Sequence, residues 1–207
     1  QDEIDRMRAD WRAHLELEFE TGQSYKPNKA DWLDGKWAGF KLADQNEEPR
    51  RGVTGANIET LKEIGHSITQ LPDGFRVHRT VQRFLDNRAK AIESGVDLDW
   101  ATAEALALCT LMLEGHNVRL SGQDSGRGTF SQRHAVWHDQ SNGEKYIPLC
   151  SVEGGRFEVR DSPLSEFGVL GFEYGYSIAD PKTLVLWEAQ FGDFVNGAQV
   201  MIDQFIA

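Results

Sequence analysis

Apolar side chains recur at intervals of three and four near the start of the chain. Over residues 2–21 this spacing places one stripe on a helix face, formed by Ile4, Met7, Trp11, Leu15 and Phe19. Residues 23–51 lack such a period and contain Pro and Gly, so we expect an extended arm. Trp32 and Trp37 favour an arm that wraps over another domain or subunit, because each docked ring buries a large apolar area. The alternative is a disordered tail whose Trp residues dock locally.

Two further amphipathic helices are predicted before residue 95. One begins at Thr54 and should be closed by Gly65 and Pro72, and the other covers about residues 79–94. The histidines at the ends of this pair fit surface or capping roles better than metal ligation, because no second ligand stands at a useful spacing: His66 and His78.

Residues 99–115 predict a helix of another kind, because so little of its surface is polar that it should be buried nearly all round. The exception is Glu104, which either faces solvent or belongs to a subunit contact, since a buried carboxylate must be paired or protonated. Cys109 in this helix and Cys150 beside a predicted strand could form a disulfide. Two reduced thiols are the simpler interpretation, and the spacing is not that of a metal site.

From residue 99 onward, helical and strand patterns alternate. Strands are predicted at residues 117–121, 156–160 and 184–187, the last of them fully buried. A hairpin over residues 135–148 should turn at residues 141–143, and helices should follow residue 165 and cover residues 197–206. This order indicates an α/β fold with a parallel sheet, although the strands are too few for a complete doubly wound domain.

These patterns divide the chain into a helix plus arm (1–52), a helical lead-in (53–97) and an α/β domain (98–207) that we expect to be truncated at its C-terminus. The sequence has 22 Lys and Arg against 33 Asp and Glu, a formal net charge of -11. Such a protein is a poor candidate for binding nucleic-acid phosphates. No apolar run approaches the ~18 residues of a membrane span, so we expect no membrane partner.

Glu166 stands at a predicted strand-to-helix junction, where open α/β sheets usually bind ligands. The apolar residues around it should desolvate its carboxylate and raise its pKa, which suits a general acid or base. The alternative, equally supported by the residues, is a helix cap in which Ser165 is the N-cap and Glu166 meets the positive end of the helix dipole.

Residues 122–134 form a glycine-rich loop that could approach a ligand closely. The loop offers fixed hydrogen-bond donors from Gln123, Arg127, Arg133 and His134. Its spacing is not that of a phosphate loop, and the alternative is a connecting loop whose arginines make salt bridges.

Several segments resemble the thiamine-diphosphate-dependent first component of the 2-oxoglutarate dehydrogenase complex. They are Val118-Arg119-Leu120-Ser121-Gly122-Gln123-Asp124, Arg127-Gly128-Thr129-Phe130-Ser131, Leu164-Ser165-Glu166, Gly171-Phe172-Glu173-Tyr174-Gly175 and Leu186-Trp187-Glu188-Ala189-Gln190-Phe191-Gly192-Asp193-Phe194. The resemblance runs over essentially the whole chain. It implies a helical lead-in followed by part of a transketolase-like pyrimidine-binding domain.

The resemblance also implies site residues. Glu166 would hydrogen-bond the pyrimidine ring of the cofactor and help to deprotonate its thiazolium carbon. Phe194, in preference to Phe191, would stack on the pyrimidine, and the backbone of Leu164 would contact its amine. Gln123 would face cofactor and substrate. Weaker candidates for substrate contact follow in the same loop: Arg133 and His134.

The resemblance implies that magnesium and the diphosphate are held by a Gly-Asp-Gly segment ending in Asn on a separate domain. This chain contains no such segment, so we expect no metal ligand here. The implied reaction is oxidative decarboxylation of 2-oxoglutarate in the tricarboxylic acid cycle, with the succinyl group passed to a lipoyl-bearing succinyltransferase. A homodimer would complete the site, in a bacterial cytoplasm or a mitochondrial matrix. Two alternatives remain: a non-catalytic structural and dimerisation module, or the same chemistry on a related acid such as 2-oxoadipate.

Overall fold

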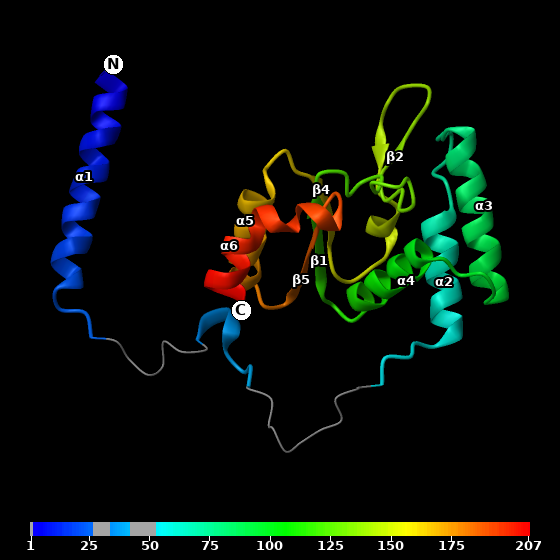
Figure 1. Ribbon diagram of the computed structural model, residues 1–207, viewed down its shortest axis with the longest axis horizontal. Coiled ribbons are helices and arrows are strands. Elements are labelled where there is room, and N and C mark those ends of the chain that lie inside the picture. The colour runs from blue at the N-terminus through cyan, green and yellow to red at the C-terminus, as the bar shows by residue number, and fades with distance from the viewer. Residues whose placement is uncertain (1, 27–33, 42–52) are drawn as a thin grey trace. The chain divides into compact units, whose positions relative to one another are not determined.

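A computed structural model describes residues 2–26, 34–41 and 53–207 (Figure 1). The chain forms two compact units, Gln1–Leu42 and Ala43–Ala207, which are described separately. In the first unit, α1 (Asp2–Gly22) confirms the predicted helix. A 3₁₀ turn (Gly35–Trp37) follows, capped by the Asp34 carboxylate. Trp32 lies outside the described residues, so docking of the arm on another domain stays a prediction.

Three helices open the second unit: α2 (Ile58–Thr69), α3 (Arg79–Ser94) and α4 (Trp100–Leu113). The capping role of His78 is confirmed, because its Nδ1 accepts a hydrogen bond from the Thr80 backbone N–H. The expectation that Gly65 closes α2 is wrong. A Cβ there would lie 2.4 Å from Cγ2 of Ile92, so glycine serves the close approach of α2 to α3 rather than the helix end.

The expectation that α4 is buried nearly all round is also wrong, because one of its faces is open. Trp100 is 92% exposed, and Ala103 and Ala107 are exposed on the same helix. The opposite face packs into the core with α2 and the sheet, through residues that include Ile64, Ile68, Leu108, Cys109, Met112, Val118 and Leu120. Both cysteines are free thiols, with Cys109 buried and Cys150 exposed.

The sheet is parallel and three-stranded, with the order β4-β1-β5. Its strands are β1 (Asn117–Gly122), β4 (Phe157–Asp161) and β5 (Thr183–Glu188). In Figure 1, α5 (Glu166–Ala179) and α6 (Gln199–Met201) lie on one side of this sheet and α4 lies on the other. The predicted α/β fold with a parallel sheet is therefore confirmed. Full burial of β5 is not, because β5 is an edge strand and most of its residues are half-buried.

The remaining elements agree with the sequence in part. The hairpin is confirmed, with β2 (Trp137–His138) antiparallel to β3 (Lys145–Tyr146). The single helix expected over residues 197–206 is instead a 3₁₀ segment (Gly192–Ala198), a short α6 (Gln199–Met201) and a π-helical turn (Ile202–Ile206). None of the described helices is both long and apolar enough to cross a membrane.

Candidate functional site

The carboxyl ends of the three parallel strands lie side by side. Gly122, the last residue of β1, is in register with Asp161 at the end of β4 and with Glu188 at the end of β5. The loops that leave these residues therefore start at the same end of the sheet, called here the carboxyl edge. The crevice outside the carboxyl ends of the strands is where open parallel sheets bind their ligands.

Glu166 is the first residue of α5 and faces the loop that follows β1. Gln123 donates from Nε2 to Glu166 Oε1 at 3.3 Å. From the other side, the 3₁₀ segment approaches so closely that a Cβ on Gly197 would lie 3.4 Å from Glu166 Oε2. Ser165 occupies the N-cap position, but its side chain makes no capping hydrogen bond. The Glu166 carboxylate is thus hydrogen-bonded by the loop after β1 and bordered by the 3₁₀ segment that contains Gly197, and it is not part of a capping pair with Ser165.

Exposed aromatic rings lie on two of the loops at this edge. Phe191 and Phe194 meet edge to face, with ring centroids 5.8 Å apart, and Phe130 meets Phe191 in the same way at 5.6 Å. Their exposed fractions are 72% for Phe130, 45% for Phe191 and 49% for Phe194. Exposed apolar rings in contact are typical of a surface that binds an aromatic or apolar partner. Phe130 was not predicted as a site residue, although it stands in the glycine-rich loop and in one of the segments that resemble the family.

Leu164 lies in the turn between β4 and α5, and its side chain is exposed. Its backbone N–H donates to Ser162 Oγ at 3.3 Å. Within the part of the chain that the structure describes, no backbone hydrogen bond to the Leu164 carbonyl oxygen is found. This oxygen is therefore available to accept a hydrogen bond from a ligand next to Glu166.

Arg133 is buried and paired with carboxylates, so its donors are engaged. Its guanidinium lies 2.6 Å from Glu104 and 2.6 Å from Glu188, and also donates to the Ser125 carbonyl oxygen. Burial lowers the pKa of Arg133, but hydrogen bonds with both carboxylates outweigh it and raise the pKa overall. Glu104 is thus ion-paired inside this chain, an arrangement the sequence did not predict. A role for Arg133 in substrate binding stays a prediction, and these ion pairs argue against it.

His134 adjoins Arg133 but lies against α3 instead of α5. Its ring centroid is 5.0 Å from that of Phe84, and its backbone adopts φ 47°. Burial lowers the pKa of His134, and the charges of Arg88 and Arg127 lower it further, against a backbone hydrogen bond with Ser131. His134 lines a cavity whose walls include neither Glu166 nor Gln123. Its predicted contact with substrate stays a prediction.

No group of three or more His, Cys, Asp or Glu side chains is placed to hold a metal ion within residues 2–26, 34–41 and 53–207. What this edge of the sheet offers is a carboxylate, an amide, a backbone carbonyl oxygen and aromatic rings. These groups suit a planar, hydrogen-bonding organic ring.

Comparison with known proteins gives a consistent result. Residues 96–207 match the family model described as the transketolase pyrimidine-binding domain. Over its whole length the chain is 63% identical to the 2-oxoglutarate dehydrogenase E1 components of Brucella canis, Brucella abortus (strain S19) and Brucella melitensis biotype 2. Each alignment covers 100% of this chain and 21% of the relative. The chain therefore spans about a fifth of the length of these curated relatives.

Proposed function

The chain belongs to the transketolase pyrimidine-binding family, and from this premise we propose that it forms the aminopyrimidine half of a thiamine diphosphate site in a 2-oxoglutarate dehydrogenase E1 component. The substrate and the reaction are inferred from the names of the relatives. The observation that carries the proposal is the Gln123–Glu166 contact of 3.3 Å beside exposed aromatic rings at the carboxyl edge of the sheet.

The side chains at this edge fit an aminopyrimidine. The ring needs a hydrogen-bonding group at one nitrogen, an acceptor for its amine and an apolar surface for its face. Glu166 would supply the first, the Leu164 carbonyl oxygen the second and Phe194, or its neighbour Phe191, the third. The space beside Glu166 also depends on Gly197, because a Cβ there would lie 3.4 Å from the Glu166 carboxylate.

Thiamine diphosphate, when bound, supplies an electron sink for loss of carbon dioxide from a 2-oxo acid. The residues of this chain would hold its pyrimidine. Glu166 would share a proton with the ring nitrogen, which would make the cofactor amine more acidic. Gln123 donates to one carboxylate oxygen of Glu166 and would thereby restrict the orientation of that carboxylate. The Leu164 carbonyl oxygen and the Phe194 ring would position the pyrimidine.

The rest of the site is proposed to lie outside these residues. Magnesium, the diphosphate ligands and part of the substrate pocket would come from other parts of the polypeptide, and a second subunit would complete the site. The product acyl group would pass to a lipoyl-bearing succinyltransferase. A chain that only builds this half of the site would act by itself as a structural and dimerisation module.

Glu166→Gln in the intact enzyme tests the proposal. General acid–base groups contribute roughly 10²–10⁴-fold, so 2-oxoglutarate decarboxylation with an artificial electron acceptor should fall by that factor. Thiamine diphosphate should still bind, because Gln keeps the size of Glu166. The matched control is Glu153→Gln, an exposed carboxylate in the turn before β4, which should leave turnover unchanged.

Near-normal turnover of the Glu166→Gln variant would contradict the proposal. A 2-oxoadipate preference in the unmodified enzyme would keep the role of Glu166 and change only the substrate. The two results are therefore separable in one set of assays.

A further inference from the structure

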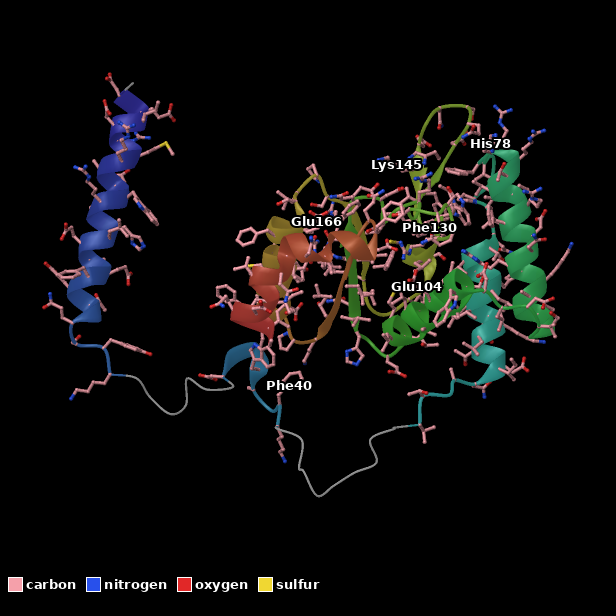
Figure 2. The ribbon with its side chains drawn as sticks, viewed as in Figure 1. Phe40, His78, Glu104, Phe130, Lys145 and Glu166 are labelled. Carbon is pink, nitrogen blue, oxygen red and sulfur yellow. The ribbon has the colours of Figure 1, made fainter. Side chains whose placement is uncertain are left out.

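A second cavity lies on the α3 side of the sheet, away from Glu166. It encloses about 550 Å³ and is formed by the start of α3, the loop after β1, the β2–β3 hairpin and the end of β4. Small-molecule sites typically enclose about 300–1,000 Å³. Figure 2 shows His78 and Lys145 on the α3 and hairpin side, separated from Glu166 at the start of α5.

The polar lining of this cavity is mostly basic. Its ionisable side chains are Arg127, Lys145, Arg160, His78, His134 and His138, against the single carboxylate of Asp161, and the neutral Gln140 also lines it. One oxygen of that carboxylate is already engaged, because it accepts the Gly126 backbone N–H at 2.8 Å. The chain as a whole carries a net charge of -11, so a basic cavity runs against its composition. Such a lining favours an anionic ligand.

Some of these basic groups are committed to partners and others are not. Arg127 is paired with Asp124, and Arg160 with Glu158. By contrast, among the residues that the structure describes, no hydrogen bond or ion pair is found for the Lys145 ammonium or the His138 ring. The two face each other as direct cross-strand partners in the hairpin. Cross-strand partners have Cβ atoms about 4.5–5.5 Å apart, so both groups can reach one anion.

The His134 ring also lines this cavity, but its Nε2 does not face the ligand space. That atom is buried, and among the described residues it has no hydrogen-bond partner. A solvent-sized molecule therefore does not reach it, and His134 contributes ring surface to the wall. The uncommitted groups open to a ligand are Lys145 and His138 of the hairpin.

Most of the rest of the wall is apolar, from Trp137 and from the aliphatic side chains of Val77, Val81, Val136, Ile147 and Val159. An ion alone would leave this surface in contact with water. We propose that the cavity binds a small organic anion, of the phosphate-ester or carboxylate class, with its anionic group between Lys145 and His138 and its apolar part against the aliphatic wall. This site is independent of the proposed cofactor site.

Calorimetric titration of the intact protein at low ionic strength tests the proposal. Phenyl phosphate and phenylacetate are the probes, and the comparison between them distinguishes a phosphate ester from a carboxylate. Inorganic phosphate represents the anionic group alone, and phenol represents the apolar ring alone. We expect saturable, one-to-one binding of at least one probe and weaker binding of both halves.

Variants then test whether the probe binds in this cavity. Lys145→Gln removes a charge-assisted hydrogen bond and should weaken binding about tenfold or more. Lys145→Glu should abolish binding, and His138→Gln should weaken it. The matched control is Lys182→Gln, because Lys182 is exposed just before β5, at the amino end of the strands and outside the cavity lining. Lys145 is itself exposed, so its substitution should not affect folding, which circular dichroism checks.

Three results would overturn the proposal. The first is no binding of either organic probe, and the second is equal binding by Lys145→Gln and the unmodified protein. The third is displacement of the probe by thiamine diphosphate, which would place it in the crevice beside Glu166. Glu166→Gln should leave probe binding unchanged, so failure of this inference and failure of the cofactor site are distinguishable.

Discussion

Arg119 ties the centre of the sheet to α5 through a buried ion-pair network. Its guanidinium donates to both carboxylate oxygens of Glu173, at 2.8 and 2.9 Å, and lies 2.9 Å from Glu158. It also stacks over Tyr176 and Phe172, at 4.7 and 5.4 Å from their ring centroids. Arg119 is 9% exposed and Glu173 is 3% exposed. Arg119→Ala would therefore leave a buried carboxylate without its partner.

The expected loss follows from that burial. Removing one partner of a buried pair costs about 3–5 kcal/mol of unfolding free energy, because the remaining charge is neither solvated nor compensated. Lost cation–π contact adds about 0.5–1 kcal/mol or more. Arg156→Ala is the matched control. The Arg156 side chain is 73% exposed and contacts the same Glu158 at 3.3 Å. An exposed pair of this kind contributes about 0–1 kcal/mol.

Urea unfolding at pH 7, followed by circular dichroism, measures both variants. A double substitution, Arg119→Leu with Glu173→Leu, distinguishes the loss of the ion pair from the cost of leaving the Glu173 carboxylate buried without a partner. It should cost much less than Arg119→Ala, since replacing a whole buried pair with apolar residues is often neutral. Glu158 should keep a partner in that variant, because Arg160 Nε donates to its Oε1 at 2.7 Å. A cost below about 1 kcal/mol for Arg119→Ala, or a double variant as unstable as the single one, would refute the reasoning.

Further predictions concern packing, thiol chemistry and acid stability. Gly65→Ala should lower the free energy of unfolding by about 1–3 kcal/mol, because its Cβ meets Ile92. Gly175→Ala lies in open space and should raise it by about 0.5–1 kcal/mol. Thermal unfolding in which both variants shift the melting temperature in the same direction would contradict this prediction. Burial raises the pKa of Cys109 to about 12, so iodoacetamide at pH 8 should modify Cys150 first and Cys109 only on unfolding, as mass spectrometry would show. Burial raises the pKa of Glu158, but hydrogen bonds from two arginines outweigh it and lower the pKa below 4.5. The stabilisation by ionised Glu158 should be complete above about pH 4.5 and should be lost as pH falls through the lowered pKa. Acid unfolding of the unmodified protein and of Glu158→Gln measures this contribution. An equal loss of stability on acidification in both proteins would contradict it.

Local signals determined how much of the fold the sequence predicted. The bounds of α3 agree with the prediction because His78 caps its start and Gly95 adopts φ 70° just past its end, both of which are local features. Gly65 misled the prediction because its role depends on Ile92 in a different helix. Burial of β5 was overestimated because an apolar run does not reveal an edge position.

The candidate site also contains features that local sequence patterns predict and features that depend on tertiary contacts. The strand pattern, the turn and the glycine-punctuated helix follow one another directly, so the position of Glu166 at the start of α5 could be predicted, whereas its role as acid–base group or helix cap could not. The ion pairs of Arg133 with Glu104 and Glu188 join residues 29 and 55 positions apart, so no local pattern reports them. The separation of His134 from Glu166 also depends on tertiary packing, in this case against Phe84.

We propose that Glu166 acts on the pyrimidine of thiamine diphosphate and thereby speeds proton loss from its thiazolium ring. The most direct measurement is hydrogen–deuterium exchange at the thiazolium carbon of the bound cofactor, in the intact enzyme and in its Glu166→Gln variant. With cofactor saturating both proteins, we expect exchange to slow by roughly 10²–10⁴-fold in the variant. An unchanged exchange rate with the cofactor bound would contradict the claim and leave Glu166 with only a structural role at the start of α5.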